Sequence, residues 1–236
     1  GNFWAVCTFI PNTITYDRAD STALAYQGGK GIGRFQAQLA DFNEPLAEVI
    51  KGFHNMRFRF EQWDAAVKAD KAGRVASLTE EIGWIESRRE EMLGFWALVE
   101  NGSIPMRVTH NDTKINNVML DSETDEAVCV IDLDTVMPGS VLYDFGDMVR
   151  TATCMASEDE EDLSKVRMEM PFFESLAEGY LDAAHNFLTQ REVEYMPFAG
   201  IMVVVWRTFS MISREISSGW EVMMVKRTAV RVPLMM

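Results

Sequence analysis

The spacing of hydrophobic residues changes along the chain, and it predicts different elements in different stretches. Residues 3–10 are mostly aromatic or β-branched, which is typical of a strand. In residues 22–41 the apolar positions fall roughly at helical spacing, and Asp20 and Ser21 precede them with side chains that cap helices well. The N-terminal part is therefore predicted to be a strand followed by a helix.

The stretch after this helix has a weak helical pattern and then a strong one. Residues 41–71 are mixed and predict only short helical pieces. Residues 78–100 predict one charged amphipathic helix, because Ser77 and Glu80 have the spacing of a capping box. Asn101-Gly102 is a typical helix end.

The middle of the chain carries short β-prone runs, whereas helical spacing returns after Tyr143. The runs are residues 106–109, 117–120 and 127–132, and polar turns separate them. The acidic cluster at residues 158–162 predicts an exposed helix start, where the helix dipole favours carboxylates. The predicted fold class is α+β, mostly helical with a small β insertion.

Composition and charge exclude several classes of partner. A formal net charge of -14 and a pI near 4.7 argue against a surface that attracts nucleic acid or anionic lipid by bulk electrostatics. The longest strongly apolar stretch, residues 198–206, is far shorter than the roughly 20 residues that span a bilayer. Cys7, Cys129 and Cys154 lie far apart, which favours reduced thiols over a disulfide framework or a zinc site. We expect a cytoplasmic protein that binds neither nucleic acid nor membranes.

The polar residues of the β insertion match the requirements of phosphoryl transfer. That reaction needs a carboxylate to orient the attacking hydroxyl, a cation near the transferring phosphate and oxygen ligands for magnesium. Asp112 and Asn117 are five positions apart with Lys114 between them, and Asp132 follows an apolar run. We expect Asp112, Asn117 and Asp132 to converge on one cleft, because a loop and a strand end must present them to the same metal.

Two motifs carry a resemblance to a known group of kinases. They are His110-Asn-Asp-Thr-Lys-Ile-Asn-Asn117 and Val130-Ile-Asp-Leu-Asp134. With His-Asn-Asp in place of the His-Arg-Asp of protein kinases, the chain resembles the aminoglycoside phosphotransferase and choline kinase superfamily. It is most similar to the N-acetylhexosamine 1-kinase group, some members of which have been labelled mucin desulfatases. The resemblance implies a mostly helical C-terminal lobe of a protein-kinase-like fold.

The resemblance implies a role for each polar residue of the two motifs. Asp112 corresponds to the catalytic aspartate, and Lys114 occupies a position that holds the transferring phosphate in some kinases. Asn117 and Asp132 correspond to the magnesium ligands. Asp134 either helps to bind the metal or is a structural carboxylate bonded to loop amides.

Three further features are expected to be structural. His110 corresponds to a histidine that braces the catalytic loop. Residues 28–33 contain glycines at the spacing of a phosphate loop, but no strand precedes them and they lie in a helical pattern. Asp144-Phe-Gly146 spells the metal motif of protein kinases, yet it comes too late after Asp112, so we expect Asp144 to brace the catalytic loop instead.

The resemblance also predicts the domain organisation. Residues 11–236 correspond to the kinase C-lobe, with the catalytic loop at 108–120 and the metal-binding strand at 127–134. Residues 220–236 do not align with the group, which leaves part of the sugar pocket undefined.

Residues 1–10 correspond to the last strand of the N-lobe and the hinge. There the backbone of Thr8, Phe9 and Ile10 is expected to bond to adenine. The rest of the N-lobe is not present in this sequence, so we expect a fragment that is inactive alone and that exposes apolar side chains around Phe9.

The implied activity is transfer of the γ-phosphate of ATP, with Mg²⁺, to the anomeric hydroxyl of an N-acetylhexosamine. Asp17 and Arg207 are the candidates for binding the sugar; the structural alternatives are a turn residue for Asp17 and a surface ion pair for Arg207. A kinase for another small alcohol, such as choline, homoserine or an aminoglycoside, stays open, and an acidic pocket would favour such a cationic acceptor. A non-catalytic binding domain also stays open.

Overall fold

The computed structural model describes residues 6–156 and 167–218, which form a mixed and predominantly helical fold. Its helices are α1 (Thr22–Gln38), α2 (Met56–Ala69), α3 (Thr79–Glu86), α4 (Arg89–Glu100), α5 (Val141–Ala152), α6 (Met170–Ala184) and α7 (Gln190–Ser218). Its strands are β1 (Thr13–Ile14), β2 (Arg107–Thr109), β3 (Val118–Asp121), β4 (Ala127–Val130) and β5 (Met137–Gly139). The predicted α+β class is confirmed.

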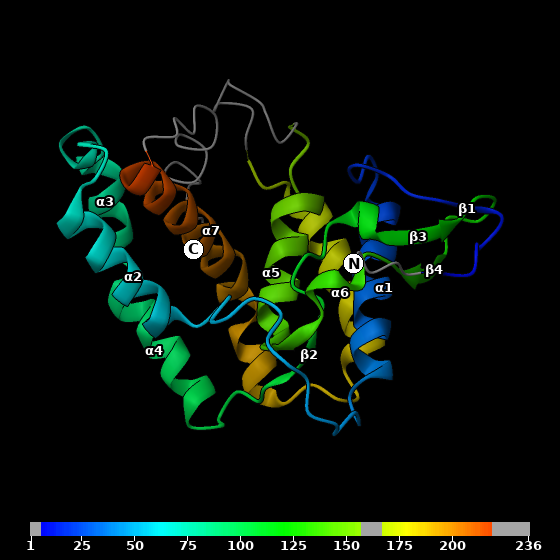
Figure 1. Cartoon of the computed structure of the whole chain (residues 1–236). Helices are drawn as coiled ribbons and strands as arrows, with labels where there is room; N and C mark the ends of the chain where they lie inside the picture. The colour runs from blue at the N-terminus through cyan, green and yellow to red at the C-terminus, as the bar shows by residue number, and fades with distance from the viewer. Residues whose placement is uncertain (1–5, 157–166, 219–236) are drawn as a thin grey trace.

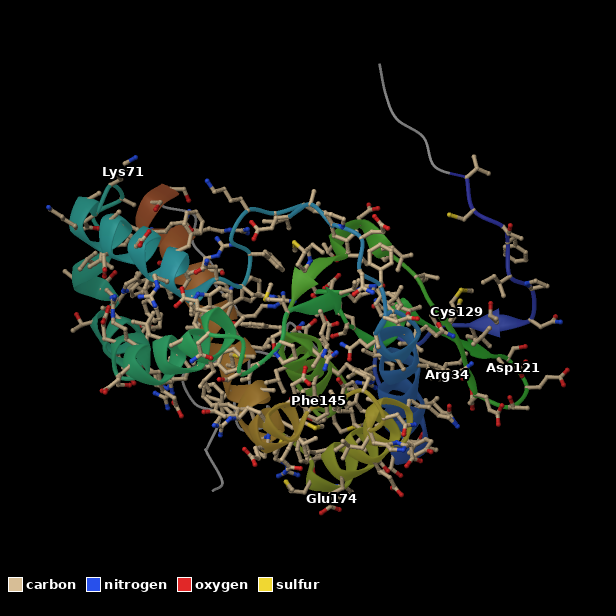
Figure 2. All side chains as sticks on the ribbon, turned by 90° about the horizontal axis from the view of Figure 1, so that it is seen from below. Arg34, Lys71, Asp121, Cys129, Phe145 and Glu174 are labelled. Carbon is tan, nitrogen blue, oxygen red and sulfur yellow. The ribbon has the colours of Figure 1, made fainter. Side chains whose placement is uncertain are left out.

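The helices form two groups on either side of the long helix α7. The helices α2, α3 and α4 lie on one side, and α5, α6 and α1 lie on the other (Figure 1). One hydrophobic core runs through both groups, and Trp63, Tyr143 and Phe209 are among its largest fully buried side chains. Figure 2 shows Phe145 of α5 inside the fold and Glu174 of α6 at its outer edge.

The glycines of residues 28–33 let α1 and α6 approach each other closely. A Cβ at Gly29 would overlap the carbonyl oxygen of Leu176, and one at Gly179 would overlap the carbonyl oxygen of Tyr26. Backbone oxygens cannot move out of the way as a flexible side chain can. The glycine pattern is therefore a helix-packing feature, and the structural interpretation of it is confirmed.

Two small antiparallel sheets make up the β insertion. β3 pairs with β4 and, on its other side, with β1, where Thr13 lies opposite Asp121. β2 pairs with β5, and Thr109 lies opposite Met137. All three predicted runs are strands, although β4 ends at Val130 rather than at Asp132. The Arg34 guanidinium of α1 reaches this insertion and donates to the Ala127 carbonyl oxygen, and Figure 2 shows Arg34 beside the hairpin that carries Asp121 and Cys129.

Residues 78–100 are not one helix. The helix α3 ends at Glu86, the Arg88 amide bonds to the Ile85 carbonyl in a tighter turn, and α4 begins at Arg89. At this break the Arg89 guanidinium contacts both Glu86 and Asp64 of α2. The break therefore depends on a tertiary contact that the local pattern does not contain.

The predicted capping box is also wrong. Val75–Ser77 forms a short 3₁₀ helix, and the Ser77 hydroxyl donates to the carbonyl oxygen of Arg74 there instead of capping α3. The residue before α3 is instead Leu78, whose side chain cannot cap.

Residues 6–10 are not a strand, in contrast to the prediction. A strand requires a partner for its backbone groups, and in the described part of the chain none pairs with this segment. Val6 is 96% exposed and Phe9 84% exposed, which agrees with the expected exposure of apolar side chains around Phe9. Phe3, the acidic cluster at residues 158–162 and the tail at residues 220–236 lie outside the described residues.

The length and composition of α7 would allow it to cross a membrane. Half of its most apolar window is buried inside the fold, where Met202, Val205 and Phe209 are nearly inaccessible to solvent. Packing against α5 and α2 is therefore a sufficient reason for its apolar composition. The absence of membrane contact stays a prediction.

Candidate active site

The catalytic loop is tied to the first turn of α5 through the buried carboxylate of Asp144. The backbone N–H groups of His110 and Asn111 donate to its two oxygens over 2.9 and 2.7 Å, and the side-chain amide of Gln36 donates to one of them over 2.7 Å. The Thr113 hydroxyl donates to the Asp144 carbonyl oxygen. Burial raises the pKa of Asp144, and the His110 and Asn111 amides partly oppose this effect. The predicted bracing role of Asp144 is confirmed.

His110 connects the loop to the end of the metal-binding segment. Its Nε2 lies 2.8 Å from the Ile131 carbonyl oxygen, and its Nδ1 accepts a 3.3 Å hydrogen bond from the Asp112 amide. The ring is fully buried, and these two contacts engage both of its nitrogens. Its predicted structural role is confirmed.

Asn117 connects the catalytic loop to the segment that leads to Asp132. Its side-chain Nδ2 donates to the Asp112 carbonyl oxygen over 2.8 Å, and its own carbonyl accepts from the Ile131 amide over 2.9 Å. Asp132, which follows Ile131 in the chain, is exposed and has a left-handed backbone with φ +61°. The fold thus brings Asp112, Asn117 and Asp132 to one region, whereas the convergence of their oxygens on one ion stays a prediction.

The donor set in this region fits magnesium. The Asn117 side chain uses its nitrogen for the loop, which leaves its amide oxygen available, and the carboxylates of Asp132 and Asp134 are exposed. Within residues 6–156 and 167–218, no three His, Cys, Asp or Glu side chains form a metal cluster by themselves. Magnesium takes few protein ligands and completes its shell with phosphate oxygens and water, so it needs no such cluster. Asp134 is exposed in the short 3₁₀ helix Leu133–Thr135, and both interpretations of it, as a metal ligand and as a structural carboxylate, stay predictions.

The carboxylate of Asp112 lies between two cations. Lys114 Nζ is 3.6 Å from its Oδ1, and Nη2 of Arg207, which α7 supplies, is 3.8 Å away. The Asp112 side chain remains 27% exposed, so a small molecule can reach it. Arg207, a predicted substrate-binding residue, is therefore beside Asp112, although it also forms an ion pair.

That ion pair involves two residues for which the sequence predicted no role. Asp147 of α5 lies 3.3 Å from Arg207 Nη2 and 2.9 Å from Arg150 Nε. The spacing of Asp147 and Arg150 on a helical pattern indicates an ion pair between them. Nothing in the local sequence indicates the contact with α7.

The remaining predicted site residues are not brought to Asp112 by any described contact. Asp17 is exposed in the bend before α1, and among the described residues no hydrogen bond or ion pair involves it. Thr8 and Phe9 are exposed, and the Ile10 carbonyl accepts from the Thr13 hydroxyl. Their predicted contacts with sugar and adenine stay predictions.

A comparison with protein families matches residues 1–194 to APH, the phosphotransferase enzyme family. The match covers most of the chain and includes the catalytic loop, the segment of Asp132 and Asp134, and the bracing helix α5. It agrees with the chemistry expected of the braced and accessible carboxylate of Asp112. The chain therefore belongs to the phosphotransferase enzyme family and is a kinase-type enzyme by descent.

Proposed function

We propose that the protein is the catalytic C-lobe of a kinase that transfers the γ-phosphate of ATP to the anomeric hydroxyl of an N-acetylhexosamine. The observation that carries the proposal is the accessible carboxylate of Asp112, held in a braced loop between Lys114 and Arg207. Kinases of this family use ATP and magnesium in general, and the proposal assigns both to this protein.

The roles of the residues follow from their positions. Asp112 orients the acceptor hydroxyl and takes up its proton as the new oxygen–phosphorus bond forms and the bond to ADP breaks. Lys114 lies beside this carboxylate, where its charge favours the developing negative charge on the phosphoryl oxygens. Asn117, Asp132 and Asp134 would hold magnesium, which supplies charge neutralisation to the nucleotide phosphates when bound.

The charges around Asp112 favour a neutral acceptor. Choline or an aminoglycoside would bring its positive charge close to Lys114 and Arg207, both within 4 Å of the reactive carboxylate. A neutral sugar meets no such repulsion, and Arg207 offers directional donors for its oxygens. Asp17 remains a second candidate for sugar binding.

The proposal includes a setting for the protein. The three cysteines are free, as a reducing compartment requires, so we infer a cytoplasmic location. The partners are the nucleotide, the sugar and an N-lobe that supplies the phosphate-covering loop. We expect no binding of nucleic acid or membranes, given the net charge of -14.

A panel of acceptors tests this function. The protein as its gene encodes it is assayed with ATP and magnesium against N-acetylglucosamine, N-acetylgalactosamine, choline and homoserine. We expect phosphorylation of at least one of the two sugars. Phosphorylation of choline or homoserine but of neither sugar would reject the sugar assignment and keep the kinase.

The same assay tests the central residue. Asp112→Asn should lower turnover by roughly 10²–10⁴, the range for loss of a positioned acid or base. Asp41→Asn removes an exposed carboxylate after α1 and serves as the matched control, with turnover unchanged. Near-normal activity of Asp112→Asn, or no turnover of any acceptor by the unmodified protein, would leave a non-catalytic binding domain as the better interpretation.

A further inference from the structure

The helix α5 presents two carboxylates, three residues apart, toward the catalytic loop. Asp144 accepts from the backbone of the loop, and Asp147 faces the cations Arg150 and Arg207. Residues three apart lie on the same face of a helix. Asp144 thus fixes the loop, whereas Asp147 contacts Arg207, whose guanidinium lies near the carboxylate of Asp112.

Asp147 is suited to hold a cation because it is almost fully buried. Its side chain is 7% exposed, and burial alone would raise its pKa. The charges of Arg150 and Arg207 outweigh that effect and keep the pKa below its usual value. Asp147 is therefore a fixed negative charge, and Arg207 is one of the two cations that stabilise it.

A single nitrogen of Arg207 is shared between two carboxylates. Its Nη2 is 3.3 Å from Asp147 Oδ1 and 3.8 Å from Asp112 Oδ1. The contact with the buried Asp147 is the shorter of the two, and the side chain of Arg207 itself is 32% exposed. The position of the guanidinium against Asp112 thus depends on Asp147.

Two unpaired atoms strengthen the link between Asp147 and Arg207. Among the described residues, Asp147 Oδ2 and Arg207 Nε are both buried without a hydrogen-bond partner. One is an acceptor and the other a donor, and Arg–carboxylate pairs are frequently bidentate. The two residues thus each keep one further polar atom, a donor on Arg207 and an acceptor on Asp147, beside the ion pair that joins them.

We propose that Asp147 is a positioning residue that sets the place of the Arg207 guanidinium beside the reactive carboxylate of Asp112. This inference rests on the proposed function, since Asp112 is the group that contacts the acceptor. Asp147 touches neither acceptor nor nucleotide and acts through Arg207. Its loss should therefore affect turnover of the acceptor and leave the KM for ATP unchanged.

A double-variant comparison tests the proposal. Asp147→Asn and Arg207→Gln should each lower kcat/KM for the acceptor by on the order of 10–100-fold, as displacement of a positioning group by about 1 Å can. The double variant should be no worse than Arg207→Gln if Asp147 acts through Arg207, as proposed. Losses that multiply in the double variant would show that Asp147 acts independently and would overturn the proposal.

Glu192→Gln is the matched control. Glu192 is another fully buried carboxylate, paired with Arg107 over 2.8 Å, and it lies outside the network of Asp112. Its substitution should lower the thermal midpoint and leave kcat/KM unchanged. A loss of kcat/KM equal to that of Asp147→Asn would mean that any broken buried ion pair has this effect, and the proposal would fail.

A structural measurement separates this inference from the proposed function. In a crystal structure of Asp147→Asn, the distance from Arg207 Nη2 to Asp112 Oδ1 should differ by about 1 Å or more from that in the unmodified protein. An unchanged distance would overturn the positioning role whether or not a sugar is the acceptor. A changed distance in a protein that phosphorylates no sugar would retain the positioning role and reject only the substrate.

Discussion

At the scale of single residues, some polar side chains of the site brace the catalytic loop, and others are exposed to solvent. Asp144 and His110 have their polar atoms occupied by the loop, whereas Asp132 and Asp134 are exposed and face no described partner. Buried polar groups are paired in folded proteins, so the exposed carboxylates are those free to bind a metal.

Replacement of these two carboxylates tests the metal site. Asp132→Asn should raise the magnesium concentration for half-maximal activity by about tenfold or more, since loss of even an outer partner of a metal ligand costs 10–100-fold in affinity. Asp134→Asn should raise it by a smaller factor. The measurement is a magnesium titration of initial rates at saturating ATP, with Asp41→Asn as control. An unchanged requirement in Asp132→Asn would refute its assignment as a ligand.

At the scale of elements, the close crossing of α1 and α6 supports the site from behind. Tyr180 of α6 donates its hydroxyl to Gln36 of α1, and Gln36 donates to Asp144. The glycines of α1 allow this approach because they place no Cβ between the helices. Helix packing and loop position are thus connected through one buried chain of hydrogen bonds.

Gly29→Ala should destabilise the protein without changing nucleotide binding. The added methyl group overlaps the backbone of Leu176, and overpacking costs about 1–3 kcal/mol of unfolding free energy. Gly94→Ala in α4 meets no atom within 4 Å and should stabilise by about 0.5–1 kcal/mol, the helix preference of alanine. Urea unfolding measures both. A raised KM for ATP in Gly29→Ala, with stability intact, would restore the phosphate-loop interpretation.

At the scale of the whole molecule, α5, α7 and the loop before α2 meet at His54, a half-buried histidine. The His54 ring stacks on Tyr143 of α5 at 3.9 Å, and Trp206 of α7 donates its indole N–H to the Phe53 carbonyl oxygen. Tyr143 in turn donates its hydroxyl to the His54 carbonyl oxygen. This junction joins the two helix groups close to the ion pair of Arg207.

The protein should lose stability as the pH falls because of His54. Burial holds its pKa at about 3, against an ordinary value of 6.5; Asp147 opposes this shift, and Arg59 and Arg207 add to it. Between these two values the unfolded chain binds a proton that the folded chain does not. The free energy of unfolding therefore falls with decreasing pH, by about 2 kcal/mol from pH 7.5 to pH 5.

Urea unfolding at the two pH values checks this dependence. His54→Gln should be less stable at pH 7.5 but should lose less on acidification, because the other titrating groups are common to both proteins. His185→Gln, at an exposed position of the chain, controls for the removal of a histidine as such. Equal losses in His54→Gln and the unmodified protein would contradict the prediction.

The sequence by itself determined the elements whose cause is local. The apolar period of residues 22–41 predicted α1, which ends at Gln38, and the short β-prone runs predicted β2, β3 and β4. The spacing of Asp112, Lys114 and Asn117 predicted that these residues meet in one loop, where Lys114 and Asn117 both contact Asp112. Their chemical roles stay predictions.

Only the tertiary structure decided the features that need a distant partner. Residues 6–10 have strand composition but no described partner strand, and the break between α3 and α4 occurs where Arg89 contacts Asp64 of another helix. Arg207 meets Asp112 only because α7 packs on α5, where Arg207 forms an ion pair with the buried Asp147. Local periodicity reports which face of a segment is apolar, whereas the choice of neighbour depends on how all the faces pack together.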